Sequence, residues 1–493
     1  MAIGIDFGTT NSAVVYQRHQ LLDEVGGRPI PSLVAIDPLT GNHKVGQDAW
    51  EMRHELEQGL WHVIGSVKLA LGHDRALAEC QGQKFNSTDI ATILFGELRQ
   101  RAERLFGHGK ATEAIVSIPV GLRADARRRV RTAATRAGID ILEFVSEPTA
   151  AFLACRDNGL PQCERVAVFD WGGGTLDVSV LQIEGNFVRE LATASLLQAG
   201  DEIDRLIASH IHRALKGEEL DRARLPAKQY DRLIVAAESA KCELSDKDEV
   251  KRFLPAYLGG DYTFKLDRPS LVALTQSIID RCIKVVADAI TAARKVGGDA
   301  KIDYIVLVGG SSRLWGLGRQ LQASFPDVIL FEPQRPAWVV AKGASILADE
   351  LTGHRNREPI YRLNHPVYLR LSDGTSLSLV RDGDPFDDKY RRFLLGIVED
   401  TDHAQLIFAV PDGHGLGILG GTPEIRSVDF LSVPLQGLPF EQVRLEAKLT
   451  KDLTLAVRAQ TEKADQHNES HWTRWEYEQL LFSYGLNNTG EPR

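Results

Sequence analysis

Hydrophobic residues over the first 350 positions follow two alternating patterns, one typical of strands and one typical of helices. The runs EAIVSIP (113 to 119) and DYIVLVGG (303 to 310) are short and apolar, which predicts buried strands. Apolar residues spaced three and four apart predict helices near 123 to 137 and 270 to 296, each followed by glycine. Such alternation of strands and helices predicts an α/β core.

The same hairpin pattern occurs twice in the chain. Residues 3 to 15 read IGIDFGTTNSAVV, and residues 167 to 180 read AVFDWGGGTLDVSV. Aligning Asp6 with Asp170 also brings the glycines of the two turns into register. Each copy has an apolar run, a glycine and threonine turn and a second alternating run, as a β-hairpin with a tight turn does. We therefore expect two similar lobes.

The pattern changes after about residue 350. The segment 351–366 is polar and contains prolines, which is typical of a linker. Apolar residues then occupy every second position in much of 367–465, a spacing typical of half-buried strands. Turns are expected at the Asp-Gly pairs 373–374, 382–383 and 412–413. This part of the chain is predicted to be a small antiparallel β domain.

The last residues, 466–493, are predicted to form a short C-terminal helix and a tail. In HWTRWEYEQLLFSYG (471 to 485), Trp472, Trp475 and Leu480 can share one face of a helix.

Composition limits the classes of protein to consider. A chain of 493 residues suggests about two to four domains, and 43% hydrophobic and 25% charged residues are usual for soluble globular proteins. The net charge of -9 gives no reason to expect nucleic-acid binding. The start MAIGIDFG lacks the features of a secretory signal, and no run of 18 apolar residues occurs, so we expect a cytoplasmic protein without membrane partners. Five scattered cysteines without CxxC spacing predict buried free thiols.

The glycine turns of the two hairpins suit phosphate binding. Turns without side chains bring backbone N–H groups close to phosphate oxygens, and threonine hydroxyls add donors. One isolated turn would be weak support, because turns select glycine anyway, but one turn on each lobe can hold a polyphosphate from opposite sides. The candidate phosphate-binding residues are Gly8, Thr9, Thr10, Asn11, Gly172, Gly173, Gly174 and Thr175.

Carboxylates near these turns suit a magnesium ion, which prefers oxygen ligands and keeps most of its waters. Asp6, Asp170 and Glu147 are the candidates. Glu147 begins EPTAAF, where proline can occupy the first helical turn, so its carboxylate is expected at a helix start. An ordinary acidic residue at a helix N-terminus accounts for Glu147 equally well. Asp177 follows its glycine turn by three residues and is suited to orient an attacking water.

Two further segments suit a nucleoside. In IVAAESAKCELS, Glu238, Lys241 and Ser245 share one polar helix face that is able to bind an adenosine. A solvated face with a Glu–Lys pair is the commoner meaning of such a pattern. In VLVGGSSRL, Gly309 and Gly310 lie between a strand and a helix, where a flat base can lie against the backbone.

Seven motifs together resemble the heat-shock protein 70 (DnaK-like) chaperones, within the actin and sugar-kinase superfamily. In order, they are IGIDFGTTNS, the lysine in SVKLALG, SIPVGLRADAR, SEPTAAF, FDWGGGTLDVSV, AAESAKCELS and LVGGSSR. The resemblance implies a two-lobed actin-like ATPase domain with a duplicated ribonuclease H-like fold over residues 1–350. It further implies a small β-sandwich, resembling the family's substrate-binding domain loosely and lacking its long helical lid.

The resemblance also implies roles for individual residues. Lys68 matches the lysine near the γ-phosphate and the attacking water, and Pro119 and Arg127 match the pair that relays nucleotide state. The implied catalytic residues are Lys68, Asp6, Glu147, Asp170 and Asp177, of which Asp6, Glu147 and Asp170 position hydrated magnesium. The implied nucleotide contacts also include Gly200, Asp201, Glu202, Glu238, Lys241, Ser245, Gly309, Gly310, Ser311 and Arg313.

Several departures from the family pattern are visible. Ala199 stands where a glycine is usual, and the charged stretch 352–366 replaces the family's leucine-rich linker. The resemblance implies an ATPase that uses ATP or ADP with Mg²⁺, and with K⁺ as an optional further cation. Its implied partners are unfolded or specific client polypeptides, with a J-domain co-chaperone and a nucleotide-exchange factor as optional partners.

Two other functions are compatible with this superfamily. A small-molecule kinase would need a catalytic carboxylate near a sugar pocket and no β domain after the lobes. A nucleotide-gated, actin-like scaffold or dedicated binding protein would use the β domain to hold a single partner.

Overall fold

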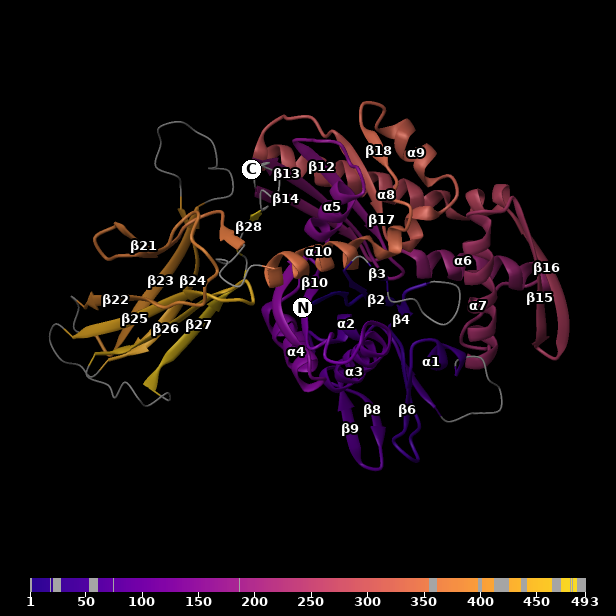
Figure 1. Cartoon of the computed structure of the whole chain (residues 1–493), viewed down its shortest axis with the longest axis horizontal. Coiled ribbons are helices and arrows are strands. Elements are labelled where there is room, and N and C mark those ends of the chain that lie inside the picture. Colours follow the sequence, from indigo (N-terminus) through magenta and orange to yellow (C-terminus); the bar gives the residue numbers. More distant parts are fainter. Residues whose placement is uncertain are drawn as a thin grey trace. The chain divides into compact units, whose positions relative to one another are not determined.

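The computed structural model is shown in Figure 1. It describes residues 2–17, 19–20, 28–52, 61–73, 75–185, 187–353, 361–397, 401–411, 425–435, 441–462, 471–478, 480 and 482–485. The chain divides into two compact units, each described here by itself. The first contains Met1–Leu181, Ala192–Ala292 and Ala300–Gly353, and the second contains Gln182–Leu191, Ala293–Asp299 and His354–Arg493.

The first unit is a mixed α/β structure with two main sheets of matching strand order. Their strands are β1 (Ile3–Asp6), β2 (Asn11–Tyr16), β3 (His19–Gln20), β4 (Ile30–Pro31), β10 (Glu113–Ile118), β11 (Asp140–Ser146), β12 (Arg165–Trp171), β13 (Leu176–Glu184), β14 (Phe187–Leu196), β17 (Tyr304–Val308) and β18 (Ile329–Phe331). One sheet runs β3-β2-β1-β10-β11, and the other contains the run β14-β13-β12-β17-β18. In each, a hairpin is followed by two parallel strands. The two predicted hairpins and the strands predicted after them are confirmed.

Helices and smaller hairpins complete the first unit. The helices are α1 (Gln47–Glu51), α2 (Val67–Ala70), α3 (Ser87–Phe106), α4 (Ala124–Arg136), α5 (Glu147–Asp157), α6 (Gly200–Lys216), α7 (Ala227–Leu244), α8 (Arg268–Gly297), α9 (Leu317–Ser324) and α10 (Val339–Gly353), with short 3-10 helices η1 (Gly310–Arg313) and η2 (Pro336–Trp338). The remaining strands are β5 (Val34–Ile36), β6 (His43–Val45), β7 (His62–Ile64), β8 (Ala76–Cys80), β9 (Gln83–Asn86), β15 (Glu249–Tyr257) and β16 (Gly260–Asp267). No helix in the described ranges is long and apolar enough to cross a membrane.

Helix α10 lies against α5 and β1 in direct backbone contact. A Cβ atom on Gly343 would lie 1.8 Å from the carbonyl oxygen of Ala150 in α5. A Cβ atom on Gly4 of β1 would lie 2.1 Å from the backbone nitrogen of Ser345. Glycine is therefore required at both positions, because any side chain would push the two helices or the helix and the strand apart.

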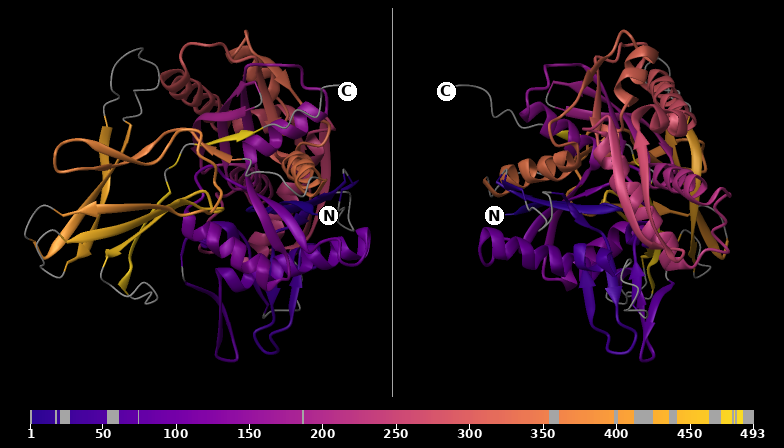
Figure 2. Two further views of the ribbon diagram at one scale, coloured as in Figure 1. Left: turned by 60° about the vertical axis from the view of Figure 1, so that its left-hand side comes forward. Right: turned by 90° about the vertical axis from the view of Figure 1, so that its right-hand side faces the viewer.

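The second unit contains two antiparallel sheets packed face to face, coloured orange and yellow in Figures 1 and 2. Their orders are β21-β20-β23-β24 and β22-β25-β26-β27. The strands are β20 (Val367–Arg370), β21 (Ser376–Val380), β22 (Arg391–Gly396), β23 (His403–Pro411), β24 (Ile425–Pro434), β25 (Gln442–Leu449), β26 (Leu455–Thr461) and β27 (Thr473–Tyr477). Phe408 and Trp475 stack between the sheets, with ring centroids 3.9 Å apart. The antiparallel strands predicted after residue 367 are thus present.

The helix predicted within residues 466–493 is wrong. Residues 473–477 form β27, and residues 482–485 form a further strand, β28 (Phe482–Gly485). In β27, Trp475 and Tyr477 face the sandwich core and stack on each other, while Arg474 and Glu476 face outward. This is a period of two, which the helical interpretation of the tryptophans overlooked. The β domain consequently extends beyond residue 465.

The predicted linker 351–366 is also shorter than expected. Helix α10 continues to Gly353, and β19 (Tyr361–Leu363) lies within the predicted linker. Within the second unit, β19 pairs with β28, and β28 pairs with the first residues of β14. The reason is aromatic packing, because Tyr361 makes edge-to-face contacts with Phe482 and Tyr484. Residues 354–360 lie outside the described residues.

Two of the predicted Asp-Gly turns are seen. Gly374 and Gly383 both have φ of 82°, which favours glycine. The pair 412–413 lies outside the described residues.

We expect Gly343→Ala to lower the free energy of unfolding by about 3 kcal/mol, because the new methyl group would force α10 away from α5. Gly96→Ala is the matched control. Gly96 lies inside α3 with nothing within 4 Å of its Cβ position, so this change should stabilise the protein by about 0.5–1 kcal/mol. Urea denaturation of both variants measures the difference. Equal stability of the two variants would contradict the packing described.

Candidate functional site

The two glycine turns face each other in the first unit. A Cβ atom on Gly173 would lie 2.4 Å from Thr10 Oγ1, and one on Gly174 would lie 3.4 Å from Thr9 Cγ2. The turn of the β1–β2 hairpin is therefore in contact with the turn of the β12–β13 hairpin. Glycine at position 173 makes this approach possible and leaves backbone N–H groups uncovered by side chains.

Lys68 in α2 and three carboxylates gather near these turns. Asp6 ends β1, Asp170 lies near the end of β12, and Glu147 begins α5, as the motif EPTAAF predicts. Lys68 Nζ donates to Glu147 Oε1 at 2.5 Å, and the lysine is only 6% exposed. Buried lysines are uncommon unless they are paired, so this contact marks Lys68 as part of the site.

Burial and mutual repulsion act on the carboxylates. Burial raises the pKa of Glu147 to about 7, against the attraction of Lys68 and with Asp6 adding repulsion. Burial, followed by repulsion from Glu147 and Asp6, raises the pKa of Asp170 well above its usual range. Burial also raises the pKa of Asp6, although Lys68 opposes the shift and Ser117 Oγ donates to Asp6 Oδ1 at 3.0 Å. One lysine is thus too few to keep all three carboxyl groups ionised.

Three buried carboxyl groups suit a further cation, which would favour their ionised forms. Within the described ranges, however, no group of three or more His, Cys, Asp or Glu side chains is arranged to hold a metal ion. The magnesium assignment of Asp6, Glu147 and Asp170 stays a prediction.

A third loop joins the glycine turns. The backbone N–H of Gly200 donates to Gly172 O at 3.2 Å, and that of Asp201 donates to Gly173 O at 2.8 Å. Ser311 Oγ donates to the same Gly172 carbonyl at 2.8 Å. The start of α6, the second glycine turn and η1 are consequently fixed to one another.

Helix α7 reaches this loop through Lys241. Its Nζ donates to Gly200 O at 3.1 Å and to Asp204 Oδ2 at 2.8 Å. Asp204 is buried, and burial raises its pKa to about 7 although Lys241 opposes the shift. Lys241 is therefore a partly buried residue that holds the loop at Gly200, unlike a lysine on a solvated helix face.

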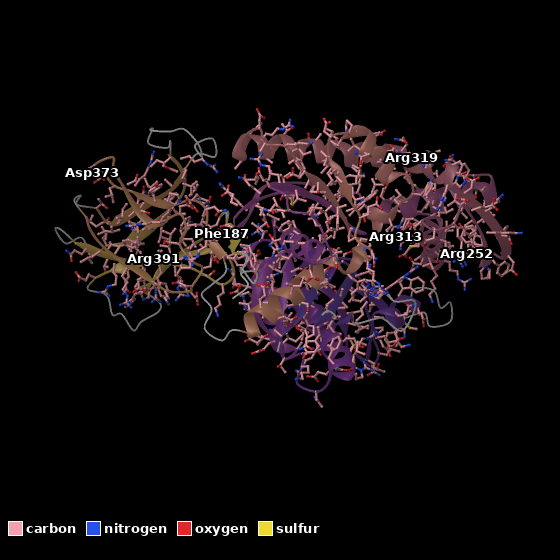
Figure 3. The ribbon with its side chains drawn as sticks, turned by 45° about the horizontal axis from the view of Figure 1, so that its top comes forward. Phe187, Arg252, Arg313, Arg319, Asp373 and Arg391 are labelled. Atoms are coloured by element: carbon pink, nitrogen blue, oxygen red, sulfur yellow. The ribbon has the colours of Figure 1, made fainter. Side chains whose placement is uncertain are left out.

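The end of α7 also contacts η1. Arg313, labelled in Figure 3, donates from Nη2 to Asp246 Oδ1 at 2.7 Å. Gly309 has φ of 82°, and a Cβ atom there would lie 2.7 Å from Asp170 Oδ1. The segment predicted to contact a base is thus packed beside the carboxylates.

Comparison with known proteins identifies the family. The family model described as Hsp70 protein matches residues 2–379, well over half of the chain. The chain belongs to the Hsp70 family. Two relatives named Chaperone protein DnaK, from Thermosipho africanus and Thermosipho melanesiensis, are each 30% identical over 370 residues. Each alignment covers 72% of this chain and 60% of the relative, so this Hsp70 protein matches less than two thirds of their length.

Some predicted residues of this Hsp70 protein are not joined to the site by the contacts described. Glu202 pairs with Arg205 at 2.8 Å, and Asn11 is exposed at the start of β2. Arg127 is buried in α4, and Pro119 follows β10, so the relay role of this pair stays a prediction. The remaining predicted contacts, Gly8, Thr175, Glu238, Ser245 and Gly310, are placed on the turns and helices already described.

The sequence did not predict three polar residues that lie near the site. Ser117 donates to Asp6, Ser195 Oγ donates to Asp177 Oδ1 at 2.5 Å, and Asp204 pairs with Lys241. Ser117 and Ser195 lie on strands far from their partners in sequence, so no local pattern reveals them. Asp204 follows Gly200 by four residues, one helical turn, and that spacing was the available signal.

The raised pKa of Glu147 predicts a pH dependence of stability. The folded state keeps a proton on Glu147 that the unfolded state, with the ordinary pKa of 4.5, releases. This contribution is fully present below pH 4.5 and is lost as the pH rises through about 7. In metal-free buffer, Glu147→Gln should therefore reduce the fall in the free energy of unfolding across this window, by up to about 1.4 kcal/mol per pH unit.

Urea denaturation at a series of pH values measures the effect. Glu164→Gln, at an exposed position, is the control and should keep the wild-type dependence. Parallel curves for wild type and Glu147→Gln would show that Glu147 titrates normally in the folded state.

Proposed function

We propose that this chain hydrolyses ATP to ADP and phosphate, and that it couples the reaction to the binding of client polypeptides. The single observation that supports this best is the buried Lys68–Glu147 contact at 2.5 Å, close to Asp6, which with Asp170 precedes the two facing glycine turns. The matching strand order of the two sheets supports the proposal that they are the duplicated lobes of an actin-like ATPase domain.

The site is proposed to position the attacking water and to neutralise the charge that develops on the phosphate. Phosphoryl transfer to water needs the water in line with the γ-phosphorus and needs cationic groups near the developing charge. Lys68 supplies a fixed ammonium, and the backbone of Gly172 to Gly174 with Thr9 and Thr10 supplies donors. Bound through water to Asp6, Glu147 and Asp170, magnesium would supply further neutralisation.

The second unit is proposed to bind clients. Support comes from the family, because both relatives are named as chaperones, and from the β-sandwich that follows the nucleotide-binding residues. We propose unfolded or specific polypeptides as the clients. A J-domain co-chaperone and a nucleotide-exchange factor are further proposed partners.

Lys68→Ala should reduce steady-state ATP hydrolysis by about a hundredfold or more, because it removes the ammonium from the phosphate site. Lys110→Ala, which removes an exposed lysine, should leave turnover unchanged. The measurement is phosphate release by the purified chain with ATP and Mg²⁺. Wild-type turnover in Lys68→Ala would refute the assignment.

Unfolded polypeptide should raise the rate of ATP hydrolysis if the two functions are coupled. We expect slow basal turnover that increases with a permanently unfolded protein and stays unchanged with the same protein in its folded form. Lys68→Ala serves as the blank. Turnover indifferent to every unfolded substrate would argue for a dedicated partner in place of general clients.

A further inference from the structure

A row of charged residues crosses the outer face of the sheet β22-β25-β26-β27. Arg392 lies opposite Glu446, Glu446 opposite Arg458, and Arg458 opposite Arg474. Glu446 is buried and accepts from Arg392 Nε at 3.0 Å and from Arg458 Nε at 2.9 Å. One carboxylate is therefore shared by two arginines, and the third arginine lies directly opposite a like charge.

Aromatic rings hold the central arginine in place. The guanidinium carbon of Arg458 lies 4.2 Å from the ring centroid of Trp472 and 4.6 Å from that of Tyr390. Lys448 Nζ lies 4.8 Å from the same tyrosine ring. Stacking and the bond to Glu446 fix the guanidinium before any partner arrives, so less conformational entropy is lost when one binds.

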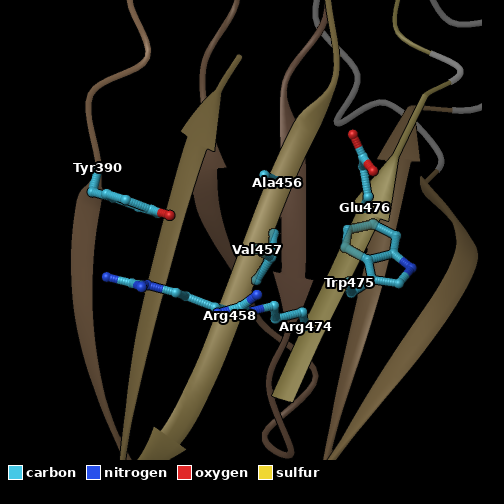
Figure 4. Close-up of a pocket in the computed structure, with 7 residues that line it drawn as sticks. All are labelled: Tyr390, Ala456, Val457, Arg458, Arg474, Trp475 and Glu476. Carbon is cyan, nitrogen blue, oxygen red and sulfur yellow. The ribbon is translucent and has the colours of Figure 1, made fainter. Parts of the chain in front are cut away.

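A hollow of about 530 Å³ opens at this row, as Figure 4 shows. It is lined by Tyr390, Ala456, Val457, Arg458, Arg474, Trp475 and Glu476. Tyr390 lies on one side and Glu476 on the other, and the Arg458 side chain extends toward the Tyr390 side.

Among the described residues of this face, cations outnumber carboxylates, although the chain as a whole has a net charge of -9. Strand register puts five cations on it, which are Arg392, Arg444, Lys448, Arg458 and Arg474. The described carboxylates near them are Glu446 and Glu476 on the same face and Asp388, which pairs with Lys448 at 2.8 Å. Like charges on opposite strands repel, and an anionic partner would relieve that repulsion.

We propose that this face, here called the arginine face, binds an acidic segment of a partner polypeptide. The cations span four strands, about 14 Å at roughly 4.8 Å per strand, which is wider than one phosphate or carboxylate group. A segment with several Asp or Glu side chains can reach Arg392 and Arg474 together, with its apolar atoms against Tyr390. The proposal is independent of ATP hydrolysis.

The test uses the full chain and a fluorescently labelled oligoglutamate peptide in an anisotropy titration. Wild type should bind the peptide, more weakly as salt is added. Arg474→Glu should weaken binding by about tenfold or more, and Arg474→Ala should weaken it less, because it removes a charge without reversing it. Arg474 is exposed and outside the Glu446 pairs, so both variants are expected to fold.

The matched control is Arg370→Glu, the same charge change at an exposed position on β20 of the other sheet, which should retain binding. Equal weakening by Arg370→Glu and Arg474→Glu would mean general electrostatic attraction and would overturn the proposal. Absence of binding by wild type would overturn it as well. So would displacement of the peptide by inorganic phosphate but not by chloride at equal ionic strength, because the site would then be one for small anions.

Discussion

The backbone contacts at Gly343 and Gly4 are the constraint on which the first unit depends. They leave no room for a side chain between α10 and its neighbours, so α5 and β1 are held at fixed distances from one helix. Ala150 is three residues after Glu147, and Gly4 is two residues before Asp6. The same contacts that define the core therefore fix the positions of two site carboxylates, which couples the packing to the chemistry.

The site in turn carries an electrostatic cost that the packing must offset. Burial disfavours the charged forms of Asp6, Glu147 and Asp170, and their mutual repulsion adds to this. Lys68 compensates only in part. Charged groups whose burial destabilises the folded protein are common at functional sites. A bound ligand of opposite charge offsets this cost.

Local patterns predicted much of this structure, and long-range contacts account for what they missed. Both hairpins and the start of α5 at Glu147 follow from turn glycines and a proline, which act within a few residues. Lys68 was found only through family resemblance, because its burial depends on a partner 79 residues away. The prediction of a C-terminal helix is wrong because it rests on the helical spacing of Trp472 and Trp475, whereas pairing with β26 imposes a period of two.

The balance of charged groups around a buried carboxylate differs between the two units. Around Glu147, carboxylates outnumber the single ammonium of Lys68, so the unmet charge is negative. Around Glu446, two arginines share one carboxylate, so the cations outnumber the carboxylate at this point. If only stability were selected, each of these buried charges would be paired with one opposite charge, because an unbalanced buried charge destabilises the fold. Carboxylates and arginines are available throughout the chain for such pairs. The opposite signs are those that the two proposals require, with a cation and polyphosphate in the first unit and an anionic polypeptide in the second.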